Sequence, residues 1–137
     1  MKTFQVHILA ADRSFYEGPC LSLVIPTSDG ERGILANHSP MIAAVQPGTL
    51  RYQVPGEEPQ LAAISPGMVK VEGNDVLVLV DSAEHPEEID AVRAQREVDE
   101  AREALLQKRS RQEHQIAQAT LARALNRLRV KAGMRGL

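Results

Sequence analysis

The sequence predicts an α+β fold, in which an all-β sandwich over residues 1–86 is followed by an α-helical domain over residues 87–137. All eight prolines and seven of the nine glycines lie at or before Pro86, whereas residues 87–132 contain neither. Both residue types interrupt helices. In the first part, turn signals separate short apolar runs about every eight to twelve residues, which is typical of a sandwich or barrel.

The first part contains seven apolar runs that we expect to form strands. They span residues 4–10, 20–26, 41–48, 50–56, 61–67, 68–74 and 75–83. In the last two runs valines alternate with other residues, as expected for strands that bury one face. We therefore predict a β-hairpin closed around Glu72–Asp75.

Composition excludes several classes of protein. The chain has one cysteine, Cys20, so an internal disulfide is impossible and a reducing compartment is expected. No apolar run approaches the roughly 18 residues of a membrane span. The first residues carry Asp12 and lack a signal-peptide pattern, so no secretory leader is expected.

The second part is predicted to be helical from a start at Ser82 or Pro86, where Glu87 and Glu88 favour initiation. Its 46 residues without Pro or Gly allow one rod of roughly 69 Å or a hairpin of two helices. Apolar or small residues form two helical stripes. The stripes are Asp90, Ala94, Val98, Ala101 and Leu105, and then Ala117, Leu121, Ala124, Leu125 and Leu128. Residues 107–113, which are all polar, form the expected elbow.

The hairpin is expected to be only modestly stable. Its stripes are narrow and rich in alanine, so they bury little area.

Charge also divides the helical part: residues 87–105 have a net charge of −4, and residues 106–137 have eight basic residues and one acidic residue. The two segments attract when antiparallel, yet the basic segment can also seek another acidic partner. We therefore predict a hairpin that can straighten when a ligand prefers one form.

The segment from Asp29 to Leu50 carries the densest pattern of turn residues, and His38 is its one candidate catalytic group. His38 has no nearby nucleophile, base or set of metal ligands in the sequence, and there is no glycine-rich phosphate loop. We interpret it as a polar loop residue at a contact surface.

The run Gly30-Glu31-Arg32-Gly33-Ile34-Leu35-Ala36-Asn37-His38-Ser39-Pro40 resembles the signature of the epsilon subunit of the F-type rotary ATP synthase. The resemblance covers essentially the whole chain. It implies a non-catalytic subunit of the central stalk of a proton-translocating synthase, which links gamma to the c-subunit ring. It also implies that the sandwich docks on gamma, and that Glu31 and His38 contact the ring.

The same resemblance implies a regulatory role for the helices. In the family the extended arm enters the alpha/beta hexamer and inhibits ATP hydrolysis. The expected inhibitory contacts are Arg109, Arg111, Arg123, Arg127 and Arg129. ATP-binding relatives carry an I/L-D-x-x-R-A motif, which Ile89–Ala94 matches. The residues that the resemblance assigns to ATP are Glu84, Asp90, Arg93, Ala94, Arg123 and Arg127. Glu100 departs from that pattern, because it stands where some relatives carry a basic residue.

The resemblance thus implies three partners, gamma, the c-ring and the alpha/beta hexamer, with no nucleic acid and no required cofactor or metal. ATP is expected as a regulatory ligand. The subunit is expected to lie at the cytoplasmic face of the cell membrane, attached only through the complex. The alternative is an adaptor or nucleic-acid-binding protein that uses its basic helix, but the acidic sandwich, a pI near 6.1 and scarce aromatic residues disfavour it. A small enzyme that uses His38 is the third reading.

Overall fold

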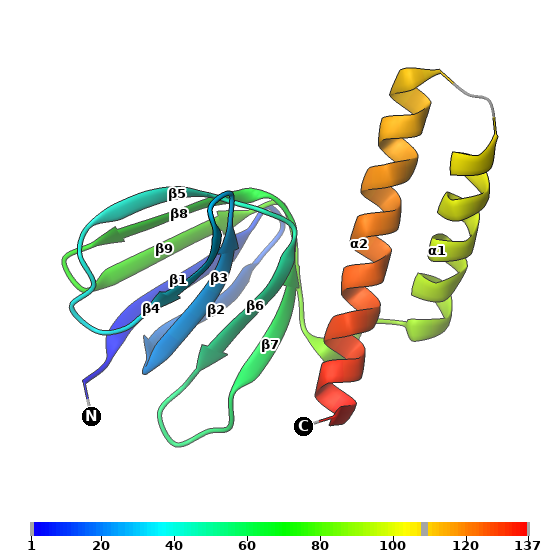
Figure 1. The fold of residues 1–137 in the computed structure, drawn as a ribbon. Helices are drawn as coiled ribbons and strands as arrows, with labels where there is room; N and C mark the ends of the chain where they lie inside the picture. Colours follow the sequence, from blue (N-terminus) through cyan, green and yellow to red (C-terminus); the bar gives the residue numbers. More distant parts are fainter. Residues whose placement is uncertain (1, 108–109, 137) are drawn as a thin grey trace. The chain divides into compact units, whose positions relative to one another are not determined.

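The structure is a computed structural model that describes residues 2–107 and 110–136. The chain forms two compact units, Met1–His85 and Pro86–Leu137. The first consists of strands and the second of helices (Figure 1).

The first unit contains ten strands within the described residues. They are β1 (Phe4–Ala10), β2 (Ser14–Cys20), β3 (Ser22–Thr27), β4 (Gly30–Ile34), β5 (Met41–Val45), β6 (Gly48–Gln53), β7 (Gln60–Ile64), β8 (Gly67–Glu72), β9 (Asp75–Val80) and β10 (Ala83–Glu84). Their hydrogen-bonded order is β10-β7-β6-β3-β5-β8-β9-β1-β2, and β4 pairs with β3. The predicted all-β sandwich is confirmed, and β3 joins its two layers because it pairs with β6 along Ser22–Val24 and touches β5 only at Thr27.

Alternating residues of the strands fill the core between the layers. In β1, Phe4, Val6 and Ile8 are buried, and each of the latter two lies in register with a buried valine of the parallel strand β9. The chain has no tryptophan, and aliphatic side chains fill most of the core. The largest fully buried side chains include Leu23, Ile25, Ile34, Leu50 and Val69. The period of two in the sequence therefore corresponds to one buried face per strand.

The predicted hairpin around Glu72–Asp75 is confirmed as β8 and β9. Gly73 and Asn74 form its two-residue turn, with φ of 57° and 68°. Positive φ at both positions is what a type I′ turn requires, and Asn-type and Gly residues tolerate it best. The sequence analysis did not predict β2 or β4, because neither has a strong apolar pattern. They form by pairing with β1 and β3, respectively.

The second unit consists of a 3₁₀ turn, η1 (Pro86–Glu88), followed by helices α1 (Ala91–Leu106) and α2 (Arg111–Gly136). Of the two predicted starts, Pro86 begins η1 and Ser82 begins no helix. The α-helix itself begins later, at Ala91, because the Asp90 carboxylate caps it. Asp90 Oδ1 accepts from the backbone N–H groups of Val92 and Arg93 at 3.0 and 3.1 Å. Such a cap satisfies donors that the first helical turn leaves unpaired.

The predicted elbow of residues 107–113 is too long. Helix α2 already begins at Arg111, since Ser110 Oγ accepts from the N–H of Glu113 at 3.2 Å and acts as its N-cap. Residues 108 and 109 lie outside the described residues. The His114 ring meets the Leu105 carbonyl at 3.3 Å, so the first turn of α2 is tied to the last turn of α1.

The helices pack against each other along the two predicted stripes (Figure 1). From α1, Ala94, Val98 and Ala101 are buried, and from α2, Ala117 and Ala124. The leucines of both stripes are half-buried, and Asp90 is exposed as the cap. Asn126 and Val130 are also buried, which the sequence analysis did not predict. No helix in the described part of the chain is long and apolar enough to cross a membrane.

Candidate functional site

Glu31 lies on a tightly turned hairpin between β3 and β4. It is exposed and stands opposite Pro26 in the antiparallel register. The turn before it is held by Thr27, whose hydroxyl donates to the Gly30 carbonyl at 2.7 Å and accepts from the Asp29 N–H at 3.2 Å. The Glu31 carboxylate is thus presented on a defined strand rather than on a loose loop.

His38 lies in the connection between β4 and β5, where the chain turns at Asn37 with a φ of 65°. The His38 N–H donates to the Leu35 carbonyl at 3.2 Å, and its ring Nδ1 donates to the Ser39 carbonyl at 2.7 Å. The imidazole is partly exposed. A ring nitrogen engaged with a backbone carbonyl suits a fixed contact residue.

The side chain of Asn74 fastens this connection to the β8–β9 turn. Asn74 Oδ1 accepts from the Asn37 N–H at 2.7 Å, and its Nδ2 donates to the Thr3 carbonyl at 3.0 Å. Two large apolar side chains of this part of the chain are exposed, Leu35 of the connection at 63% and Ile42 of β5 at 71%. These exposed aliphatic groups lie on the same stretch of the chain as Glu31 and His38, and such groups suit contact with a protein partner. Sequence reasoning missed Asn74, since it lies 37 residues from Asn37.

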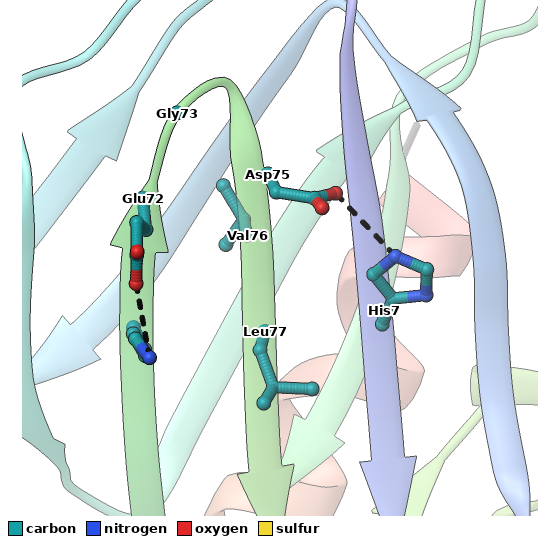
Figure 2. Close-up of a pocket in the computed structure, with 7 residues that line it drawn as sticks. His7, Glu72, Gly73, Asp75, Val76 and Leu77 are labelled. Atoms are coloured by element: carbon teal, nitrogen blue, oxygen red, sulfur yellow. Dashed lines mark ion pairs between the residues drawn. The ribbon is translucent and has the colours of Figure 1, made fainter.

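An open hollow of about 460 Å³ lies on the β8–β9 hairpin, with His7 of β1 at its side (Figure 2). His7 stands between two carboxylates, Glu17 at 3.1 Å and Asp75 at 3.5 Å, and Lys70 pairs with Glu72 at 3.0 Å. Lys70, Glu72, Asp75 and His7, which line this hollow, therefore each have a polar partner nearby. Among the described residues, no group of three or more His, Cys, Asp or Glu side chains is placed to hold a metal ion.

Burial governs the two titrating groups of β2 whose pKa values depart from the usual range. Desolvation raises the pKa of the Cys20 thiol to about 11, although hydrogen bonding with Tyr16 opposes part of the shift. Desolvation, with the neighbouring thiol, raises the pKa of the Tyr16 phenol to about 12. The Tyr16 hydroxyl donates to the Pro19 carbonyl at 2.6 Å. Cys20 is fully buried and protonated near neutral pH, which argues for a structural rather than a reactive thiol.

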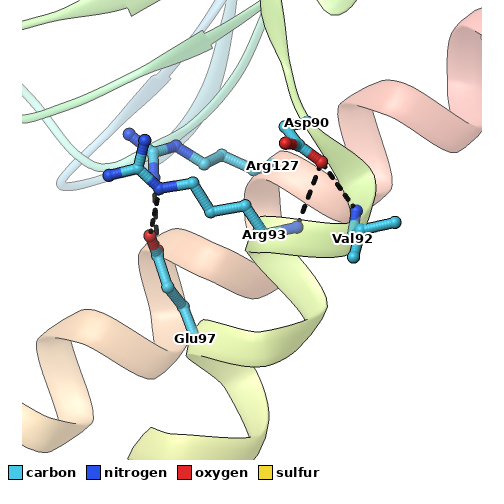
Figure 3. Close-up of polar contacts among 5 residues, drawn as sticks. All are labelled: Asp90, Val92, Arg93, Glu97 and Arg127. Atoms are coloured by element: carbon cyan, nitrogen blue, oxygen red, sulfur yellow. Dashed lines mark hydrogen bonds and ion pairs between the residues drawn. The ribbon is translucent and has the colours of Figure 1, made fainter.

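In the helical unit, two of the arginines assigned to ATP come together around one carboxylate (Figure 3). Glu97 of α1 lies 3.5 Å from Arg93 Nε through one oxygen and 3.3 Å from Arg127 Nη1 of α2 through the other. Arg93 is 78% exposed, whereas Arg127 is 27% exposed. Sequence reasoning missed Glu97, although its position four residues after Arg93 was a signal for an ion pair.

The other residues assigned to ATP have separate surroundings. Asp90 is engaged as the cap of α1, and Ala94 is buried in the helix seam at 2% exposure. Arg123 is exposed on α2. Glu84 belongs to the first unit, where its strand β10 pairs with Ala63 of β7. Of the residues assigned to ATP, Arg93 of α1 and Arg127 of α2 therefore lie together in the helical unit. Asp90 stands at the start of α1.

The residues predicted to inhibit hydrolysis are mostly exposed. Arg111, Arg123 and Arg129 are exposed on α2, and Arg127 is the half-buried partner of Glu97. Arg109 lies outside the described residues. The exposed arginines give α2 a basic surface, which suits an acidic partner.

Two family models together match nearly the whole chain. Residues 3–86 match the beta-sandwich domain of the ATP synthase delta/epsilon chain, and residues 87–132 match its long alpha-helix domain. Curated relatives agree in length. The ATP synthase epsilon chain of Caldanaerobacter subterraneus subsp. tengcongensis is 42% identical over 130 residues, covering 94% of each chain. That of Ruminiclostridium cellulolyticum is 39% identical, covering 93% of this chain and 95% of the relative.

Two solved structures share the fold. A chain of the Euglena gracilis mitochondrial ATP synthase, solved as OSCP/F1/c-ring in rotational state 1, has a TM-score of 0.73 at 21% identity, covering 98% of this chain and 80% of that one. A chain of the Tetrahymena thermophila mitochondrial ATP synthase central stalk and c-ring has a TM-score of 0.66 at 14% identity, covering 95% and 97%. With the sequence signature, both domain matches and these relatives in agreement, the chain belongs to the ATP synthase delta/epsilon chain family, as an epsilon-type subunit rather than a catalytic one.

Proposed function

We propose that this epsilon subunit divides two tasks between its units: the sandwich links gamma to the c-ring in the central stalk, and the helical arm restrains ATP hydrolysis. The family match over residues 3–132 favours this role over nucleic-acid binding. The solved neighbours come from a synthase with its c-ring and from a central stalk with its c-ring, which supports the same partners here.

In this proposal the ring contact is made by the surface that carries Glu31 and His38. Both side chains reach solvent. The hydrogen bonds of Thr27 hold the turn before Glu31, and Asn74 holds the connection that carries His38. A rotating coupling needs such a defined surface, because a contact that slips transmits no torque. The subunit would then lie at the cytoplasmic face of the membrane and be held there by its partners.

One observation carries the proposed restraint of hydrolysis: the helix seam is made largely of alanines. Ala94, Ala101, Ala117 and Ala124 are buried, and each alanine side chain removes little apolar area from water. The hairpin is therefore weakly held, and its opening costs little. An opened arm would offer the basic face of α2, with Arg111, Arg123 and Arg129, to acidic surfaces of the alpha/beta hexamer.

ATP is proposed as the ligand that favours the closed hairpin. Arg93 of α1 and Arg127 of α2 converge on one anion position, so a phosphate there would join the two helices. A ligand that binds the hairpin but not the opened arm shifts the equilibrium toward the hairpin.

The experiment is a truncation after His85 in the assembled synthase. His85 is retained because its ring stacks on Phe15, with centroids 4.0 Å apart and an interplanar angle of 22°. We expect the truncated subunit to assemble with gamma and the ring, and ATP hydrolysis to rise several-fold while coupling is preserved. Hydrolysis equal to that of the full-length complex, at equal subunit content, would show that the arm is not the brake.

A further inference from the structure

We infer that Glu97 is a built-in competitor for the proposed nucleotide phosphates: its carboxylate occupies the anion position between Arg93 and Arg127, so it weakens nucleotide binding and closes the hairpin without nucleotide. This inference rests on the ATP-binding part of the proposed function. It concerns the regulation of that site rather than its existence.

One carboxylate contacts two guanidinium groups that come from different helices (Figure 3). One oxygen of Glu97 faces Arg93 Nε at 3.5 Å, and the other faces Arg127 Nη1 at 3.3 Å, across 30 residues of sequence. Phosphate oxygens use the same donors of arginine that a carboxylate uses. A phosphate that takes these two groups, Arg93 Nε and Arg127 Nη1, must therefore displace Glu97.

The burial of the three side chains indicates how an incoming anion would reach this bridge. Its side chain is 25% exposed, similar to Arg127 at 27%, whereas Arg93 is 78% exposed. The carboxylate thus lies at the inner side of the pair, and an incoming anion meets Arg93 before it reaches Arg127. Even a displaced Glu97 stays on the same helix turn and repels the polyphosphate at short range.

The same bridge ties the helices together. Because Glu97 joins α1 to Arg127 of α2, the arm has an anion in its seam before any nucleotide arrives. The contribution is small, as expected for a partly exposed pair. The alanine seam is weak as well, so even a small contribution matters for the balance. The chain therefore has a hairpin that depends less on ATP than one lacking this carboxylate.

The test is Glu97→Gln, which keeps the size of the side chain and removes its charge. ATP and inorganic tripolyphosphate are titrated calorimetrically into the full-length subunit. A distance probe between labels at Arg102 and Gln118, both exposed on their helices, reports the closed hairpin. We expect Glu97→Gln to tighten both ligands by on the order of tenfold, because one repelling charge is lost at short range. We also expect the hairpin population without ligand to fall.

The matched control is Glu103→Gln, which removes the same charge from an exposed position of α1. Glu103 lies roughly 9 Å further along the helix axis, about one Debye length at physiological ionic strength. We expect its affinities to stay within about twofold of those of the unmodified chain. An equal gain in affinity in both variants would show that the overall charge of the helix, and not the position of Glu97, sets the affinity. That result would overturn the inference.

The ligand affinity and the probe distance together distinguish a Glu97 that competes with phosphate from a Glu97 that only supports the hairpin. A structural Glu97 would loosen the hairpin when neutralised and would therefore weaken ATP binding, so unchanged or weaker binding overturns the inference while the ATP site stands. If the unmodified chain binds no ATP but Glu97→Gln does, the inference is supported, because the carboxylate blocks the site. If neither binds, the ATP site and the inference fail together.

Discussion

Gly67 packs its Cα against the backbone carbonyl of Leu79, with no room for a side chain between β8 and β9. A Cβ at Gly67 would overlap the Leu79 oxygen and also crowd the Cα of Val80. The close approach lies where β8 pairs at once with Val45 of β5 and Val80 of β9. A glycine is therefore required here by space and not by the backbone angle.

We predict that Gly67→Ala destabilises the sandwich by about 3 kcal/mol or more, because the obstructing atoms are backbone and must move with their strand. Urea unfolding followed by circular dichroism measures the change. Gly33→Ala is the matched control: nothing lies within 4 Å of its added Cβ, and we expect a change within about 0.5 kcal/mol. Equal effects at the two glycines would contradict the steric explanation.

We predict that Ala124→Leu opens the helical hairpin. Ala124 is fully buried in the seam, so a larger side chain must push the helices apart, at a cost of about 1–3 kcal/mol. The distance between probes on α1 and α2 should lengthen, and the assembled synthase should hydrolyse ATP more slowly. Ala119→Leu, at an exposed position of the same helix, should change neither. Faster hydrolysis in the Ala124 variant would reverse the proposed direction of the switch.

We predict that Asp90→Ala frays the start of α1, whereas Asp90→Asn does not. The carboxylate caps the N–H groups of Val92 and Arg93, and asparagine accepts the same hydrogen bonds. Loss of the cap costs about 1 kcal/mol. Amide exchange of Val92 and Arg93, measured by NMR, should therefore quicken about fivefold in the alanine variant alone. Exchange that quickens equally in both variants would show that the charge of Asp90 matters, rather than its hydrogen bonds as a cap.

We predict that the sandwich loses stability as the pH rises from 9 to 11. The folded state holds the Cys20 proton until a pKa of about 11, whereas the unfolded thiol releases it near the ordinary value of 9.0. Between these values the unfolded state binds fewer protons, so the free energy of unfolding falls with pH, by on the order of 1–2 kcal/mol.

Urea unfolding at several pH values checks this prediction, and Cys20→Ala should flatten the decline. The comparison uses slopes against pH, since the alanine variant also leaves a small cavity. The raised pKa of Tyr16 contributes with the same sign at higher pH, so Tyr16→Phe serves as the parallel control. A slope that is unchanged by Cys20→Ala would show that burial does not hold this proton.

Local patterns were enough to predict the general plan of the chain. The alternating valines of β8 and β9, the turn at Gly73-Asn74 and the alanine stripes of α1 and α2 are all visible within short windows. Helix boundaries were less accurate. Asp90 and Ser110 act as caps, yet Pro86 and the polar run 107–113 are the stronger signals in the sequence. The sequence does not show which side chain turns back to the backbone, and capping depends on that.

Only the tertiary structure decided which strands pair and which side chains far apart in the sequence come into contact. Strands β2 and β4 exist because β1 and β3 supply partners for their backbone groups. Asn74 reaches Asn37 only after β4, β5, β8 and β9 have closed. Likewise, Glu97 and Arg127 meet because the hairpin folds α2 back along α1.

The order of residues by itself determined where strands give way to helices and which face of each element is apolar, because backbone preference and periodicity act over a few residues. Only the folded molecule decided that Arg93 and Arg127 share a carboxylate and that Gly67 can hold nothing larger. Such encounters depend on the closure of the whole sandwich and of the whole hairpin, which no short stretch of sequence encodes.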